Sequence, residues 1–212
     1  MRERAGDERA GAERAAAERA GNERAGRAER RREALIGRLM DVFLDRGFAE
    51  LSVADLAAEL RCSKSTLYAV AASREQIIAA VVRAFFRRAT ERVEAALALE
   101  TDPRERVGAY LRAISRELAP ASPAFFADLD AFAPAREIYK ENTGFAVRRV
   151  RGLVREADGR MPGADAAFLG AVAGQVMESI HRGEIEARTG LDDSAAYAAL
   201  ASLIVARMRP PG

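Results

Sequence analysis

The chain has 212 residues, of which 49% are apolar and 31% charged, and its formal net charge at pH 7 is +2. The apolar fraction is sufficient for a buried core, and the abundance of Ala, Leu, Arg and Glu predicts an all-α fold. A single cysteine, Cys62, excludes a disulfide framework within one chain and is typical of a cytoplasmic protein. No apolar run is long enough to span a membrane, so no membrane partner is expected. Because the net charge is so small, only local charge can indicate a nucleic-acid partner.

Residues 2–26 repeat a five-residue unit that begins as RERAG and ends as NERAG. A five-residue period builds no apolar stripe along a helix, and each glycine in the repeat costs a helix interior about 1 kcal/mol relative to alanine. We therefore expect residues 1–30 to be a low-complexity, disordered extension with some nascent helix. Two interpretations stay open: a solvated tail, or a basic arm that contacts DNA through the cluster Arg30, Arg31 and Arg32.

The segment 51–68, LSVADLAAELRCSKSTLY, predicts two short helices joined by a tight turn. Ser52 and Asp55 have the spacing of a capping box for the first helix, and Ser63 is placed to cap the second. A helix as short as the second needs a scaffold, yet its polar side chains face outward. This combination indicates a helix-turn-helix whose second helix enters a DNA major groove. The residues on its exposed side are Lys64, Ser65, Thr66 and Tyr68.

Further helices are expected on both sides of this motif. An amphipathic helix over 31–46 ends at Gly47, and Ser73 opens a long helix that reaches about Leu99. Beyond it, caps and breaks at Pro120 and Gly159 predict helices over 103–118, 134–158, 164–181 and 192–208, with a short aromatic segment at 122–132.

Several of these features together resemble the amino-terminal signature of the TetR family of transcriptional regulators. They are Phe43 and Gly47, then SVADLA, CSKSTLY and finally SREQI at 73–77. Two features depart from the family pattern: Val70 and Ala71 replace an aromatic or histidine followed by phenylalanine, and Leu39 replaces a small residue. The added volume at Leu39 could offset the lost ring.

The resemblance implies a homodimer that binds a pseudo-palindromic double-stranded DNA operator through residues 31–77. It further implies that residues 78–212 form a dimerisation and effector domain, in which an unknown small molecule releases the DNA. On this basis Lys64, Thr66 and Tyr68, with their neighbours Ser63 and Ser65, are expected to contact bases and phosphates. Ser52 and Arg74, at helix amino termini, are expected to contact the DNA backbone. Val70 cannot supply the polar phosphate contact common in the family, so we expect compensation from Arg27, Arg30, Arg31 and Arg32.

Two clusters in the carboxy-terminal part are candidate sites. One is a group of aromatic residues that predicts a ligand cavity on the order of a few hundred Å³. The alternative is that these residues belong to the ordinary core. They are Tyr110, Phe125, Phe126, Phe132, Tyr139 and Phe145. The other is a group of small and apolar residues on the last two helices that predicts a dimer interface. The alternative is that the two helices form a hairpin within one chain. The residues are Ala166, Gly170, Gly174, Met177, His181, Tyr197, Leu200, Leu203 and Ile204.

The sequence offers little for catalysis. His181 is the only histidine, which excludes a His-rich metal site; no Ser-His triad is predicted either, and the residue is expected to be solvated or at an interface. No catalytic residue, metal site or cofactor is therefore predicted. Two rival classes stay open: a ligand-independent DNA-organising or protein-interaction factor on the same fold, which would have no internal cavity, and a small helical enzyme.

Overall fold

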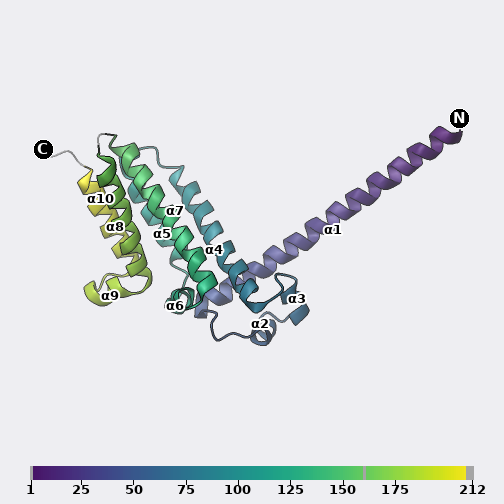
Figure 1. Cartoon of the computed structure of the whole chain (residues 1–212), viewed down its shortest axis with the longest axis horizontal. Helices are drawn as coiled ribbons and strands as arrows, with labels where there is room; N and C mark the ends of the chain where they lie inside the picture. The colour runs from purple at the N-terminus through teal and green to yellow at the C-terminus, as the bar shows by residue number, and fades with distance from the viewer. Residues whose placement is uncertain (1, 160, 209–212) are drawn as a thin grey trace.

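The computed structural model describes residues 2–159 and 161–208, with side chains from residue 21 onward, and the described chain contains α-helices but no strand (Figure 1). The predicted all-α class is therefore confirmed. The helices are α1 (Arg2–Arg46), α2 (Val53–Glu59), α3 (Lys64–Tyr68), α4 (Arg74–Leu97), α5 (Pro103–Leu118), α6 (Pro123–Ala131), α7 (Ala133–Ala157), α8 (Gly163–His181), α9 (Glu184–Thr189) and α10 (Asp193–Arg207). In this described part, none of the helices combines the length and apolar content needed to cross a membrane.

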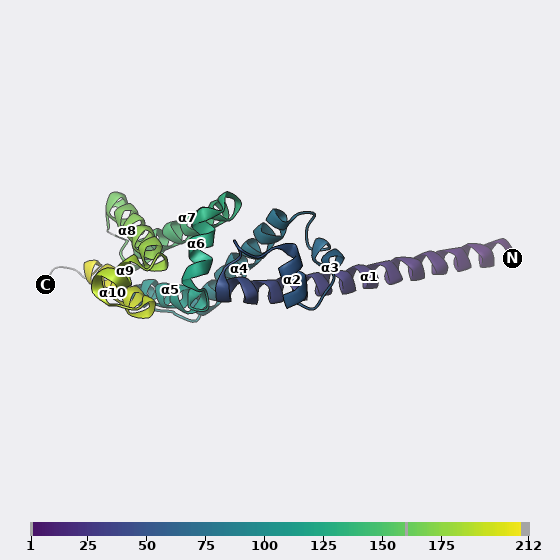
Figure 2. The same cartoon turned by 90° about the horizontal axis from the view of Figure 1, so that it is seen from below.

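The first helix differs most from the sequence prediction. Residues expected to form a disordered extension belong to the 45-residue helix α1, which projects from the body of the molecule past α3 (Figures 1 and 2). Ala, Glu and Arg are strong helix formers, and their summed propensity outweighs the glycines to which the sequence argument gave too much weight. Residue 1, which the prediction also covered, lies outside the described residues.

The amino-terminal core is built from one face of α1 together with α2, α3 and the start of α4. Leu39 and Phe43 of α1 are fully buried, as are Leu67 of α3 and Ile77 of α4. Gly47 ends α1 with a φ of +79°, a backbone conformation that favours glycine. Val70 and Leu39, one residue from each departure from the family pattern, are both buried. Whether their volumes offset one another stays a prediction.

In the carboxy-terminal part, α4, α5 and α7 pack against one another, α8 packs on α7, and α10 packs on α5 (Figure 2). The helices begin close to where the sequence predicts, and side-chain caps are present at Ser73 of α4, Asp102 of α5, Ser122 of α6 and Asp192 of α10. The short helix α9 lies between the predicted helices 164–181 and 192–208 and was not predicted. Left-handed glycines at 183 and 190 bound it, with φ values of +70° and +73°.

The amino-terminal unit is joined to the rest through α6. The Ser122 N–H donates to the Leu44 carbonyl at 2.8 Å. The Asp128 carboxylate accepts hydrogen bonds from the N–H groups of Phe48 and Ala49, in the turn between α1 and α2. One short helix of the larger domain therefore holds the loop that leads into the helix-turn-helix.

Candidate nucleic-acid interface

The two short helices of the motif are capped as the sequence predicts. Ser52 and Asp55 form a reciprocal capping box: the Asp55 N–H donates to Ser52 Oγ at 3.2 Å, and the Ser52 N–H donates to Asp55 Oδ2 at 2.9 Å. The Ser52 hydroxyl also donates to Asp55 Oδ2 at 2.6 Å, and this bond, followed by the one from the Ser52 N–H, lowers the pKa of the Asp55 carboxyl. Ser63 Oγ accepts from the Thr66 N–H at 3.1 Å and so caps α3.

Helix α3 has one buried side chain, and its other side chains are exposed to solvent. Leu67 is fully buried, whereas Lys64, Ser65, Thr66 and Tyr68 are exposed. The hydroxyl groups gather at its amino terminus, where Ser63 Oγ lies 2.7 Å from Ser65 Oγ and 2.8 Å from Thr66 Oγ1. The side chains expected to face outward therefore do so, and their contact with DNA stays a prediction.

Arginines hold carbonyl groups around the motif, a role that the sequence argument missed. Arg38 donates to the Leu60 carbonyl at the end of α2 at 2.5 Å. Arg32 donates to the Val70 carbonyl, just beyond α3, at 3.4 Å. Cationic groups near a helix carboxyl end also offset its partial negative charge. No sequence spacing signals these contacts, because they join segments more than 20 residues apart.

Arg74 has a different role from the one expected. Its Nε donates to the Leu51 carbonyl at 2.7 Å, and its Nη2 donates to the carbonyls of Phe48 and Ala49 at 2.8 and 2.6 Å. The guanidinium is thus engaged by the turn between α1 and α2 and supports the start of α2 from within the protein. Ser52, by contrast, is exposed at the amino terminus of α2.

A small cavity lies in the region where the sequence predicts an effector site. A cavity of about 40 Å³ lies among α4, α5, α7 and α8, and its lining includes Tyr110, Tyr139 and Phe145. Phe125, Phe126 and Phe132 are absent from that lining. The expectation that they line the cavity is wrong, because they pack in an aromatic core that continues to Phe43, Phe48, Phe85 and Phe86. The cavity is far smaller than predicted, since close packing of the four helices fills most of the space.

His181 lies at the wall of this cavity and is buried, contrary to the expectation that it is solvated or at an interface. Its Nδ1 lies 2.7 Å from the Tyr139 hydroxyl, and its Nε2 lies 2.8 Å from the Tyr197 hydroxyl. Its ring stacks on Phe126, with ring centroids 4.6 Å apart and planes inclined by 9°. Burial lowers the pKa of His181 to about 4, so the imidazole is neutral at pH 7. Because it has two hydroxyl partners, a neutral ring can donate to one and accept from the other.

The residues predicted to form a dimer interface mostly pack inside one chain. A Cβ on Gly170 would lie 2.9 Å from the Val147 carbonyl oxygen of α7, and one on Gly174 would lie 2.5 Å from Val147 Cγ2. Ala166 and Met177, together with Tyr197, Leu200 and Ile204, are buried in the single chain as well. Small residues predict close helix approach but not which helix approaches, and here the partner is α7.

A second face of α8 and α10 is apolar and exposed. Leu203, one of the predicted interface residues, is 71% exposed, and Phe168, which was not among them, is 68% exposed. Whether either contacts a second copy stays a prediction. An apolar groove of about 200 Å³ runs between the two helices beside them. Its lining is almost entirely apolar: Leu169, Val172, Val176, Ile185, Leu191, Ala196, Ala199, Leu200, Leu203 and Ile204.

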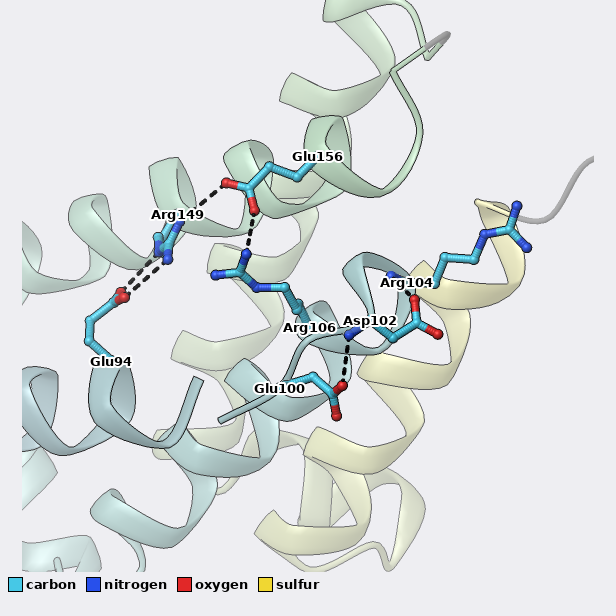
Figure 3. A network of polar contacts seen from close by, with 7 residues as sticks. All are labelled: Glu94, Glu100, Asp102, Arg104, Arg106, Arg149 and Glu156. Carbon is cyan, nitrogen blue, oxygen red and sulfur yellow. Dashed lines mark hydrogen bonds and ion pairs between the residues drawn. The ribbon is translucent and has the colours of Figure 1, made fainter. Parts of the chain in front are cut away.

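At the end of the larger domain away from α3, charged side chains tie three helices together (Figure 3). Arg149 of α7 makes a bidentate contact with Glu94 of α4, at 3.0 and 3.1 Å. Glu156 bridges Arg149 at 3.6 Å and Arg106 of α5 at 3.1 Å. The hydrogen bonds with Glu94 raise the pKa of Arg149. The carboxyl half of α4 is therefore fixed to α5 and α7.

These features define a helical protein that presents a helix-turn-helix on a larger helical domain. Comparison with known proteins agrees: residues 36–81 match the family model for bacterial regulatory proteins of the tetR family. The chain thus resembles the TetR family of transcriptional regulators, and the resemblance in sequence lies in the segment that holds the helix-turn-helix.

Solved structures share the fold over most of the chain. A TetR-like transcriptional regulator from Rhodococcus sp. RHA1 is 20% identical, with a TM-score of 0.60 over 82% of this chain and 93% of that one. A transcriptional regulator of the TerR/AcrR family from Aquifex aeolicus VF5 is 17% identical, with a TM-score of 0.56 over 82% and 97%. The TetR family regulator PfmR from Thermus thermophilus is 22% identical, with a TM-score of 0.51 over 81% and 97%. At such identities the likeness concerns the fold. No curated protein matches the chain.

Proposed function

We propose that this regulator is a homodimeric repressor that binds a pseudo-palindromic operator through α3 and is released by a small molecule. The observation that supports the proposal most is the structure of α3: Leu67 is buried and fixes the helix to the core, while its polar side chains are exposed. The helix lies within residues 36–81, which match the tetR family model. The Lys64 ammonium can bind a phosphate or a guanine edge, and the Tyr68 ring can pack on a thymine methyl group. The hydroxyls of Ser65 and Thr66 can donate to or accept from either base type.

A second copy of the chain is the partner that fits the exposed apolar face of α8 and α10. One short recognition helix reads too few base pairs, and a symmetric pair of helices matches a pseudo-palindromic site. In a twofold dimer the same face of each copy would bury Phe168, Leu203 and the adjacent groove. Both helices lie at the end of the molecule opposite the projecting part of α1, which leaves α3 unobstructed (Figure 1).

The coupling between effector and DNA would run through α6. Phe126 of α6 stacks on His181 at the cavity wall, and Asp128, two residues later, holds the turn that leads into α2. An effector that enlarges the cavity displaces His181 or Tyr139 and so shifts α6. The carboxyl half of α4 stays fixed by the Glu94–Arg149 pair, so the motion would reach α2 and the start of α4. The effector needs only a higher affinity for the shifted arrangement than for the DNA-binding one.

One observation favours the rival function, a DNA-binding factor that responds to no ligand. The cavity of about 40 Å³ has room for only a water molecule or two. Release of operator DNA by at least one compound in a broad metabolite screen would decide for the repressor. Unchanged DNA binding across the screen would favour the ligand-independent factor.

Selection of bound fragments from a random DNA pool tests the DNA-binding function, with Tyr68→Ala and Lys64→Ala as variants. Lys140→Ala, an exposed lysine on α7, is the matched control. We expect the parent and the control to enrich the same sequence and the α3 variants to enrich a different or weaker one. An identical enriched sequence for all four proteins would show that α3 does not read the bases.

A further inference from the structure

The projecting half of α1 has no role in the function proposed so far. Both views show that it leaves the body beside α3 and continues away from α8 and α10 (Figures 1 and 2). The point of departure is held, because Arg32 donates to the Val70 carbonyl just beyond α3. From that residue outward α1 is one continuous helix, so its side chains keep a set position relative to the recognition helix.

Charge is distributed unevenly along this projecting helix. Residues 2–23 contain five arginines and six acidic residues, a net charge of −1. Residues 24–32 contain five arginines and one glutamate, a net charge of +4. These nine residues carry more positive charge than the net excess of the whole chain, and they are the ones next to α3. The repeat therefore changes character where it reaches the helix-turn-helix.

Three of these arginines share one side of the helix. Arg24, Arg27 and Arg31 follow the spacing i, i+3, i+7, which places them in a row. With a rise of about 1.5 Å per residue, the row spans roughly 10 Å, which is close to the rise of three phosphates of one strand measured along the duplex axis. All three are exposed. Arg27 approaches Glu23 at 3.9 Å, and an exposed pair at that distance competes weakly with a phosphate.

We propose that the row Arg24, Arg27 and Arg31 is a second DNA-binding surface, which contacts backbone phosphates flanking the half-site read by α3. Residues 2–23 take no part in this contact. A row presented by a helix is already ordered before binding, so little conformational entropy is lost when it meets the backbone. Phosphate contacts strengthen binding and fix the register on the duplex without adding sequence preference. The inference rests on the proposed DNA-binding function and adds a location to it.

The test compares two triple variants with the same change in net charge. Arg24, Arg27 and Arg31 are changed to glutamine in one, and Arg4, Arg9 and Arg14 in the control. Glutamine keeps helix propensity close to that of arginine, which circular dichroism can verify. Dissociation constants are measured over a range of salt concentrations on two duplexes: the selected operator with flanking DNA, and a short duplex that ends at the edges of the half-sites.

On the flanked operator the dimer of the first variant lacks six phosphate contacts, three per copy, so we expect the log–log salt slope to fall by about 5 units. The slope of the control should stay at the parental value. The enriched sequence should be the same for both. On the short duplex the first variant and the parent should have equal slopes. Equal slopes for the two variants on the flanked operator, or the same loss on both duplexes, would overturn the proposal. If the parent selects no sequence at all, the DNA-binding function itself fails.

Discussion

Replacement of Asp128 by alanine tests how α6 holds the helix-turn-helix. The carboxylate accepts two backbone N–H groups, those of Phe48 and Ala49, and the contact to Ala49 is 2.7 Å long. The same turn is also bound by Arg74, which donates to its carbonyls. The turn therefore has its N–H groups satisfied from α6 and its carbonyls satisfied from α4. Removal of the carboxylate leaves both N–H groups without their partner.

The magnitude follows from the two bonds and their exposure. A hydrogen bond to a charged group contributes about 1.5–3 kcal/mol, and the loss is smaller where water can replace the acceptor. The bond to Phe48 is partly buried, whereas the bond to Ala49 is exposed. We therefore expect Asp128→Ala to lower the free energy of unfolding by about 2 kcal/mol, almost all of it from the Phe48 N–H. Asp128→Asn keeps one acceptor and should lie between the parent and the alanine variant.

Urea unfolding followed by circular dichroism measures this change. Asp130→Ala is the matched control on the same helix, because Asp130 pairs with Arg182 at 3.0 Å and the two side chains are 38% and 41% exposed. An exposed pair of this kind contributes at most about 1 kcal/mol. A loss in Asp128→Ala no larger than that in Asp130→Ala would refute the role assigned to Asp128. The Asp128 variant should also bind the operator more weakly, since the entry into α2 is loosened.

Three further predictions concern the larger domain. The pKa of His181 in the folded protein, about 4, lies below its ordinary value of 6.5. Between those pH values only the unfolded chain binds this proton. The free energy of unfolding therefore falls by up to about 1.4 kcal/mol per pH unit as the pH drops from 6.5 to 4. His181→Asn should remove this part of the pH dependence, measured by urea unfolding. Gly174→Leu should destabilise the monomer fold by more than about 2 kcal/mol, because its side chain meets Val147, and parental stability would contradict the α7–α8 packing. Phe168→Glu with Leu203→Glu should give a folded monomer in ultracentrifugation, and a persistent dimer would place the interface elsewhere.

Local signals in the sequence were enough to predict the helix-turn-helix. Capping residues act on N–H groups only a few positions away, so Ser52, Ser63 and Ser73 could be assigned before the fold was known. The exposure of α3 followed from the same reasoning, because only Leu67 has the character of a buried anchor. The boundaries of most later helices were predictable for the same reason.

Contacts between distant segments could not be predicted in this way. Gly170 and Gly174 indicate that a helix packs closely, yet the choice between α7 and a partner chain depends on the tertiary fold. His181 looked like a surface residue because nothing in its own helix shows that Tyr139 and Tyr197 converge on its two ring nitrogens. The role of Arg74 likewise depends on a turn 23 residues earlier in the chain.

The claim that two copies of α3 read a twofold site together is tested most directly by changing the spacing of that site. The operator obtained by selection is compared with a version in which about five base pairs, half a helical turn, are inserted between its halves. Such an insertion rotates one half-site to the opposite face of the duplex. The account predicts that the parent loses its preference for the altered operator over random DNA, while full-turn insertions of about ten base pairs weaken binding less. Equal affinity for the original and the half-turn operator would contradict it.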